Sequence, residues 1–284
     1  MKKIRIGGVP EHFNMPWHLL LKSSKLKKKG IEASWEDYPG GTGAMIEALN
    51  KNKIDMAMLL TEGAIKGIYQ GSEYKIVSFF VDSPLIWGIH VPAKSDYQTM
   101  EDVKGKVYAI SRYGSGSHLM SIVDAESRSW PAEKLAFNVV KDLDGARKAL
   151  ANLEADIFLW EKYTTNKYVQ SGEMRRIDEC PTPFPCFVIC VNTKFLKKHA
   201  DLIKYLLKQL FKTSRKLSKH AEKVKIIAGH FELDPKDVKD WIKHTRWTMK
   251  WDLKKKRINK PLKILKRLNL IDDKLKYRDV VFKL

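Results

Sequence analysis

The sequence predicts an α/β protein of two doubly wound lobes joined by a two-strand hinge, with a helical C-terminal region. Short apolar strands alternate with helical segments, as in open α/β sheets. The alternation begins again after Pro92, and from Lys194 onward the chain reads as helical almost to its end. The first lobe is therefore expected to be discontinuous. The expected ranges are residues 1–91 plus 192–284 for the first lobe and 92–191 for the second.

Apolar runs and turn residues place the elements of the first lobe. The predicted strands are 4–9, 31–36, 55–60, 74–81 and 85–91. The predicted helices are 15–29, 44–52 and a segment from after Gly63 to Gln70, with Pro16 tolerated in a first turn. This alternation predicts a parallel sheet with helices on both faces.

The second lobe and the C-terminal region follow the same reasoning. The predicted strands are 107–110, 135–140, 156–160, 174–177 and 187–191. The predicted helices are 99–104, a segment opening at His118, 142–152 and 161–170. Beyond Lys194 the helical pattern is expected to break near Gly229, at Asp234-Pro235 and at Pro261.

A short internal repeat links the two lobes. Gly43-Ala44 and Ala48-Leu49 precede Asp55, just as Gly145-Ala146 and Ala149-Leu150 precede Asp156. In each copy an apolar strand then delivers a glutamate, Glu62 or Glu161, near its C-terminal end. The chain is expected to cross between lobes near 90–93 and 188–193. Since ligands of open α/β sheets bind outside the carboxyl ends of the strands, two such lobes predict a cleft that closes on its ligand.

Composition limits the function classes. No run approaches the ~18 apolar residues that a membrane span needs. The three cysteines do not suggest a disulfide framework, and Cys186 and Cys190 are expected to be core residues. The N-terminus lacks the apolar segment of a signal peptide, so a cytoplasmic location is expected unless a leader has been removed.

The formal net charge of +20 could indicate nucleic acid or an anionic membrane surface as a partner. The lysines of the C-terminal third are scattered through amphipathic patterns, and no helix-turn-helix, zinc-finger or RNA-recognition signature is present. A solvated lysine-rich surface is therefore favoured, and no specific nucleic-acid partner is expected.

A Gly/Ser turn at residues 111–118 is the strongest candidate binding element. A short apolar strand precedes it and a helix follows, so free backbone N–H groups and the helix dipole favour an anion there. Ser115 and Ser117 add hydroxyl donors. The alternative is an ordinary β-α turn with a serine N-cap. Gly40–Gly43 also precedes a helix and has the same two interpretations, anion site or flexible turn.

The other candidates also have two interpretations each. Glu11-His12-Phe13 follows a strand end and suits either a site wall or a surface loop. Glu62 and Glu161 could grip an amino group or cap their own helices. Trp160 could be a stacking wall or a core residue, whereas Trp241, Trp247 and Trp251 are expected to pack between helices.

Four motifs carry a resemblance to a known family: residues 6–13, 39–43, 60–63 and 111–118. With them the chain resembles type 2 periplasmic-binding-protein-like proteins, in the branch of sulfonate, nitrate and taurine binding proteins and thiamine-pyrimidine synthases. It is most similar to a group without signal peptides first described from a Candida protein. The resemblance implies hinge closure on a small polar or anionic organic ligand, with an ABC transporter permease as the usual partner.

The favoured interpretation is thus a solute-binding protein without chemistry of its own, cofactor or metal. The rival is a cytoplasmic enzyme of the thiamine-pyrimidine or menaquinone-precursor type, with His12 or His118 as general base. The cysteine-rich iron motif of the synthase is absent. The expected ligand-binding residues are Glu11, His12, Phe13, Tyr38, Thr42, Gly43, Thr61, Glu62, Tyr113, Ser115, Ser117, His118, Trp160 and Glu161.

Overall fold

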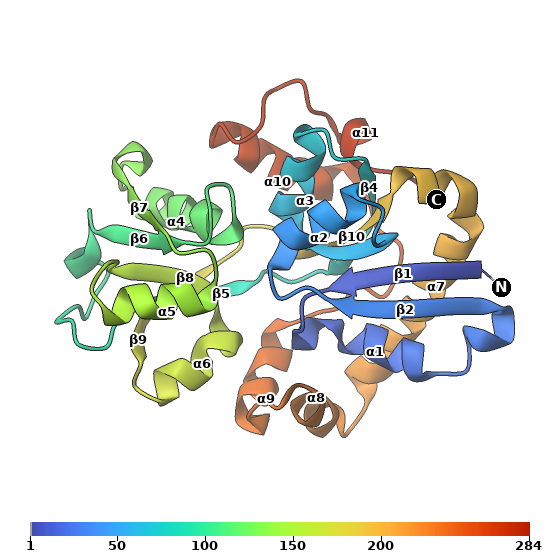
Figure 1. Ribbon diagram of the computed structural model, residues 1–284, viewed down its shortest axis with the longest axis horizontal. Helices are drawn as coiled ribbons and strands as arrows, with labels where there is room; N and C mark the ends of the chain where they lie inside the picture. The colour runs from blue at the N-terminus through green and yellow to red at the C-terminus, as the bar shows by residue number, and fades with distance from the viewer. Residues whose placement is uncertain (1) are drawn as a thin grey trace. The chain divides into compact units, whose positions relative to one another are not determined.

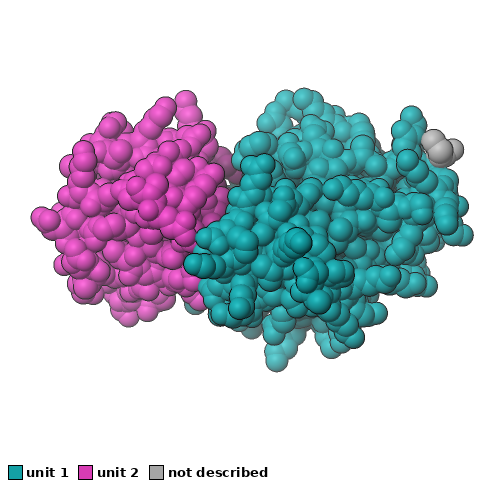
Figure 2. All heavy atoms as spheres, turned by 90° about the horizontal axis from the view of Figure 1, so that it is seen from below, with its two compact units in different colours: residues 1–84, 184–284 teal, residues 85–183 magenta. Residues whose placement is uncertain are grey.

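The computed structural model describes residues 2–284 and divides the chain into two compact units (Figure 2). Unit 1 comprises the chain up to Pro84 together with Phe184–Leu284, and unit 2 is Leu85–Pro183. Both divisions between the units lie earlier in the chain than the boundaries expected from the sequence. The reason lies in strand pairing, because the strand after Pro84 pairs only within unit 2 and the strand after Phe184 only within unit 1.

Unit 1 is built on a five-stranded mixed sheet of order β2-β1-β3-β10-β4 (Figure 1). Strands β1 and β2 are parallel, as are β1 and β3, whereas β10 runs antiparallel to β3 and β4. The expectation of an all-parallel sheet is therefore wrong for one strand, β10. The strands are β1 (Lys2–Gly8), β2 (Ile31–Asp37), β3 (Met56–Leu60), β4 (Tyr74–Val81) and β10 (Phe187–Asn192).

Unit 2 repeats this topology with a sheet of order β7-β6-β8-β5-β9. Here β6 is parallel to β7 and β8, and β5 runs antiparallel to β8 and β9. In both units the antiparallel strand is the one that follows a chain crossing. The repeat suggested by the sequence is thus a repeat of topology. The strands are β5 (Ile86–Pro92), β6 (Val107–Ile110), β7 (Ala136–Val139), β8 (Ile157–Glu161) and β9 (Met174–Pro181).

Helices cover both faces of each sheet (Figure 1). In unit 1 these include α1 (Met15–Lys22), α2 (Gly41–Asn50) and α3 (Thr61–Tyr69), and in unit 2 α4 (Gly116–Ser127), α5 (Leu143–Ala151) and α6 (Lys162–Gln170). Helix α1 is shorter than expected, because Ser23 is extended and its hydroxyl donates to the Leu20 carbonyl. Single 3-10 turns occupy 12–14, 27–29, 101–103 and 132–134.

The C-terminal part of unit 1 is helical, as expected. Its helices are α7 (Thr193–Lys219), α8 (Lys223–Phe231), α9 (Pro235–His244), α10 (Lys255–Arg267) and α11 (Tyr277–Val280). The break at Asp234-Pro235 is confirmed, since the Asp234 side chain caps α9. The expected break at Pro261 is wrong. Pro261 lies inside α10 with its ring buried, so packing offsets the backbone hydrogen bond that proline cannot donate.

The cores of the two units are apolar and contain the three cysteines. Cys180, Cys186 and Cys190 are free and buried, which confirms the expectation that Cys186 and Cys190 are core residues. Across residues 2–284, no helix is both long enough and apolar enough to cross a membrane.

Candidate functional site

In each unit the parallel strands carry the predicted residues to one edge of the sheet. In unit 1, β1, β2 and β3 end just before the segments that hold His12, Tyr38 and Glu62. In unit 2, β6 and β8 are parallel neighbours and end at Ile110 and Glu161. The carboxyl ends of strands are where open α/β sheets bind ligands, so each unit has one candidate edge.

In unit 2, the turn between β6 and α4 is held by buried serines. Ser115 is the N-cap of α4, and its hydroxyl oxygen accepts a hydrogen bond from the His118 N–H at 3.3 Å. The Ser117 hydroxyl lies 3.0 Å from that of Ser115 and accepts a hydrogen bond from the Ser111 N–H at 3.0 Å. Gly114, with φ of +77°, lets the chain turn sharply, and its N–H donates to His118 Nδ1 at 3.0 Å.

This arrangement leaves donors available at the start of α4. Within the described part of the chain, the backbone N–H groups of Gly116 and Ser117 have no hydrogen-bond partner. They belong to the first helical turn, where the helix dipole is positive. The turn is therefore both a capped β-α turn and a potential anion site, so the two interpretations of the sequence are compatible.

Arg112 is a residue of this turn that the sequence reasoning missed. It follows Ser111 at the end of β6 and, among residues 2–284, has no acidic partner. Arg112 is an exposed residue whose guanidinium is partly desolvated, which lowers its pKa, yet it stays protonated at neutral pH. Its position, as a basic residue inside a Gly/Ser turn that follows a strand, is the sequence feature that could have identified Arg112.

Two aromatic rings lie beside this turn. Tyr113 is 65% exposed, and its ring packs edge-on against His118 and Phe137 at centroid distances of 5.3 and 6.0 Å. Because most of its area remains open, the Tyr113 ring is available to a ligand. His118 is half-buried, and its Nδ1 serves the turn as an acceptor.

Glu161, at the end of β8, is buried and caps α6. One carboxylate oxygen accepts hydrogen bonds from the Thr164 N–H at 2.6 Å and the Thr164 hydroxyl at 2.8 Å. Burial nevertheless raises the pKa of Glu161 to about 7. Its neighbour Trp160 stacks on Phe158 at 5.3 Å and packs on the core beside α5, as the core interpretation of Trp160 predicts.

In unit 1, Glu62 lies two residues after the end of β3, in the first turn of α3, and lacks such partners. Both carboxylate oxygens are buried without a hydrogen-bond partner in the described chain. Burial raises the pKa of Glu62 to about 7. An unsatisfied buried carboxylate is costly, so this group favours either a proton or a ligand that donates to it.

The threonines around Glu62 fix the loops that surround it. Thr42 Oγ1 accepts a hydrogen bond from the Leu60 N–H at 3.1 Å. The Thr61 hydroxyl donates to the Pro185 carbonyl at 2.6 Å, and its N–H donates to the Cys186 carbonyl at 2.9 Å. Gly43 lies in the first turn of α2. Thr42 and Thr61 thus join α2, β3 and the segment before β10 at one place.

The segment Glu11–Phe13 leads from β1 into the interior of unit 1. His12 is 2% exposed, stacks on Phe13 at 4.9 Å and meets the Trp241 ring edge-on at 4.2 Å. Trp247 donates from its indole nitrogen to the Phe13 carbonyl at 2.8 Å. Trp241, in α9, is buried as expected of a helix-packing residue, whereas Trp247 is buried outside any helix, in a bridge to Val81.

Burial lowers the pKa of His12 to about 3, so this histidine is neutral and weakly basic at physiological pH. That environment disfavours His12 as the general base of an enzyme. Tyr38, just after β2, is half-buried, and burial raises its pKa to about 12. Glu11 is also half-buried.

Comparison with known proteins identifies the fold. Residues 87–180 match the model of the Ca3427-like periplasmic binding proteins. A Bacillus subtilis (strain 168) protein, provisionally named an aliphatic sulfonates-binding protein, is 25% identical over 255 residues, which cover 86% of this chain and 74% of that protein.

Two solved structures extend the similarity to the whole chain. The Candida albicans CA3427 gene product is 26% identical, with a TM-score of 0.84 over 100% of this chain and 98% of its own. SsuA of Xanthomonas axonopodis pv. citri, an alkanesulfonate-binding protein bound to MOPS, is 17% identical, with a TM-score of 0.81 over 100% and 99% of the two chains. The second likeness supports the fold alone. The chain therefore has the type 2 periplasmic-binding-protein fold, and its residues 87–180 match the Ca3427-like family of that fold.

Proposed function

We propose that this protein is a solute-binding protein that closes on a small polar organic ligand with an anionic group, performs no chemistry on it, and serves ABC-type transport. The observation that carries the proposal is the donor set at the start of α4. Arg112 has no acidic partner there, and the N–H groups of Gly116 and Ser117 have no acceptor in the described chain. The relationship to sulfonate-binding proteins supports a sulfonate as the anionic group.

The chemistry of the turn suits a sulfonate or carboxylate. Backbone N–H groups at a helix start point toward an anion, and the dipole favours negative charge. A guanidinium adds charge-assisted and often bidentate hydrogen bonds, which are about twice as strong as neutral ones. The Tyr113 ring supplies an apolar surface for the part of the ligand next to the anion.

The acidic residues suggest the other end of the ligand. Glu62 has two buried acceptor oxygens without donors, so a ligand amino or hydroxyl group that donates to Glu62 would relieve its desolvation. The proposed ligand is therefore an anion that also carries an amino or hydroxyl group.

The test is calorimetric titration of the purified protein with taurine, propanesulfonate, MOPS and the matching carboxylates. At least one of these anions is expected to bind, and Arg112→Gln should weaken it by about tenfold or more, as expected for loss of a charge-assisted hydrogen bond. Lys134→Gln removes an equal charge from an exposed site of unit 2 and should change affinity little. Equal effects of the two variants, or no binding by any anion, would contradict the proposal.

A further inference from the structure

The positive charge of the chain is concentrated in its C-terminal third. Residues 194–284 contain 28 lysines and arginines against 10 aspartates and glutamates, which accounts for +18 of the net +20. The candidate ligand-binding residues of the two units all precede this segment. The charge therefore calls for an explanation of its own, separate from the proposed solute site.

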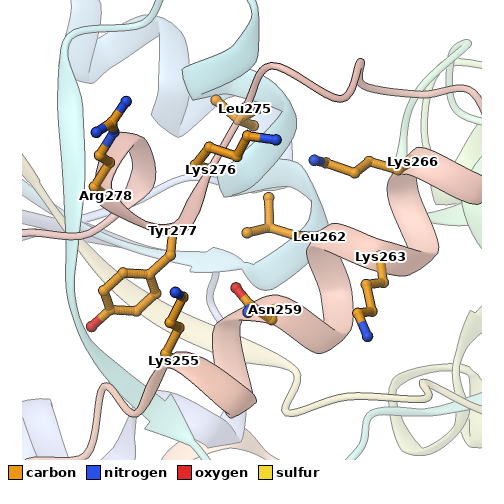
Figure 3. A pocket seen from close by; sticks show the side chains of 9 residues that line it. All are labelled: Lys255, Asn259, Leu262, Lys263, Lys266, Leu275, Lys276, Tyr277 and Arg278. Carbon is orange, nitrogen blue, oxygen red and sulfur yellow. The ribbon is translucent and has the colours of Figure 1, made fainter.

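Part of this charge surrounds a pocket of unit 1 formed by α10, α11 and the segment between them (Figure 3). The pocket has a volume of about 450 Å³, and none of the side chains that line it is acidic. Its size lies within the ~300–1,000 Å³ range of small-molecule sites. The five cationic side chains that line it are Lys255, Lys263, Lys266, Lys276 and Arg278.

Two of these lysines converge inside the pocket. The ammonium groups of Lys266 and Lys276 point toward one another (Figure 3) and donate to the same acceptor, the Asp273 carbonyl, at 3.1 and 2.6 Å. A neutral carbonyl oxygen does not compensate two positive charges. The Asp273 carboxylate lies 3.5 Å from Lys266, but its side chain is 95% exposed, so water screens that ion pair.

The remaining groups leave the pocket under-neutralised. Among residues 2–284, Lys255 and Lys263 have no ion pair, and Arg278 has only Asp279 at 3.9 Å. Leu262 and Leu275 supply apolar lining, and Asn259 supplies an amide. An anion placed between Lys266 and Lys276 would relieve their mutual repulsion and gain two charge-assisted hydrogen bonds.

We propose that the pocket between α10 and α11 binds a multiply charged phosphate group. The number of cations exceeds what one sulfonate or carboxylate needs, and the pocket is open enough on one side for a compact polyanion to enter. Single-stranded nucleic acid fits less well, because such sites stack bases on aromatic rings, whereas the one aromatic ring of this pocket, Tyr277, is fixed by its hydroxyl to the Leu253 carbonyl at 2.6 Å. The phosphate can belong to a free metabolite or to a lipid headgroup.

The test is titration of the full-length protein with tripolyphosphate at about 0.15 M NaCl, where diffuse surface attraction is screened. Lys266→Gln/Lys276→Gln is expected to weaken binding by at least about tenfold, through loss of two charge-assisted hydrogen bonds. The matched control is Lys256→Gln/Lys260→Gln, which removes the same charge from exposed positions of α10 outside the pocket and should leave affinity within about twofold. Lys276→Gln alone, at an exposed position, repeats the test if the double variant melts early.

Two further arms separate the sources of the phosphate. Co-sedimentation with phosphatidylcholine vesicles, with and without a phosphorylated inositol lipid, tests the headgroup, and tripolyphosphate should compete with it if the same pocket binds both. Retention on the inositol-lipid vesicles supports a lipid source, and its absence together with tripolyphosphate binding supports a free metabolite. Absence of tripolyphosphate binding, or equal loss in the two double variants, would overturn the proposal. Tighter binding of a single-stranded RNA that both double variants weaken equally would also overturn it.

Discussion

Glu62 and Glu161 show how the same residue type near the end of a strand acquires different surroundings. Glu161 is the last residue of β8 and Glu62 is the second residue of α3, just after β3; both are buried, and burial raises the pKa of each to about 7. Glu161 has two donors from Thr164, whereas Glu62 has none in the described chain. The sequence repeat placed these carboxyl groups, but only packing decided which of them remained without a donor.

Because Glu62 is buried, we predict that Glu62→Gln raises the free energy of unfolding by an amount that depends on pH. In the unfolded chain Glu62 loses its proton near pH 4.5, but in the folded chain it does so near pH 7. The folded state therefore binds more protons between these values, so stability is present below about pH 4.5 and is lost as pH rises to about 7. The loss levels off above that, at an order of ~3 kcal/mol.

We therefore expect Glu62→Gln to exceed the wild type in free energy of unfolding at about pH 8 by up to ~3 kcal/mol, and to match it at about pH 4. Urea unfolding at the two pH values measures this difference. Glu133→Gln, at an exposed position, serves as the control and should show no pH-dependent gain. An equal effect of Glu62→Gln at both pH values would be inconsistent with a protonated Glu62.

At the scale of elements, the start of α4 has a structural role in addition to its proposed binding role. The Ser115 hydroxyl satisfies the His118 N–H, so Ser115→Ala removes the cap and should cost about 1 kcal/mol of unfolding free energy. Ser115→Thr retains an oxygen at the same place and should recover most of that loss. Thermal and urea unfolding of both variants check this, and identical losses in alanine and threonine would argue against capping.

The start of α5 depends on a glycine for space. A Cβ on Gly145 would lie 1.8 Å from the Val140 carbonyl oxygen, which belongs to the backbone and cannot rotate away. Gly145→Ala should therefore destabilise unit 2 by more than about 2 kcal/mol. Gly229→Ala in α8 is the matched control. It meets nothing within 4 Å and should stabilise by roughly 0.5–1 kcal/mol. Calorimetric melting of both variants compares them.

Strand positions were predictable because each strand is a compact apolar run between turn residues. Strand direction was not, since the antiparallel course of β10 and β5 follows from pairings with strands far along the chain. The sequence also failed to predict helix ends that depend on local geometry, as at Ser23, or on burial that overrides helix propensity, as at Pro261.

The candidate site also has a part that the sequence could predict and a part that only the fold explains. The Gly/Ser turn was recognisable because its chemistry is local. Two features required the fold. The first is that no acid reaches Arg112 in the described chain. The second is the burial of His12 against Trp241, a residue more than two hundred positions away in sequence. A sequence shows which groups are present at a turn, but not which distant groups come to neutralise or cover them.

For the whole molecule, the uneven charge predicts a response to salt. The +18 carried by residues 194–284 lies within unit 1, where like charges repel one another in the folded state. Raising NaCl from about 20 to 200 mM should screen this repulsion and raise the melting temperature of unit 1 by a few degrees. Sodium chloride is preferable to sulfate, which stabilises proteins by exclusion from their surface. A falling melting temperature would show that attractive ion pairs dominate instead.

Unit 2 is also predicted to fold by itself. All five of its strands come from one continuous segment, and within residues 2–284 none of them pairs with a strand of unit 1. A fragment of residues 85–183 should therefore give a cooperative melt and a dispersed NMR spectrum. A matched fragment lacking β5 would lose the strand between β8 and β9 and should not fold. A disordered spectrum for the 85–183 fragment would show that unit 1 is needed to stabilise it.

The pairing of β5 with β9 brings the two ends of unit 2 side by side. Ile86 lies opposite Pro181, and Leu85 and Thr182 exchange two hydrogen bonds of 2.9 Å. Unit 2 is thus an inserted segment whose first and last residues lie next to each other. Unit 2 can therefore be exchanged as one segment through two adjacent chain junctions, which would move the turn before α4 into another host without redesign of the host sheet.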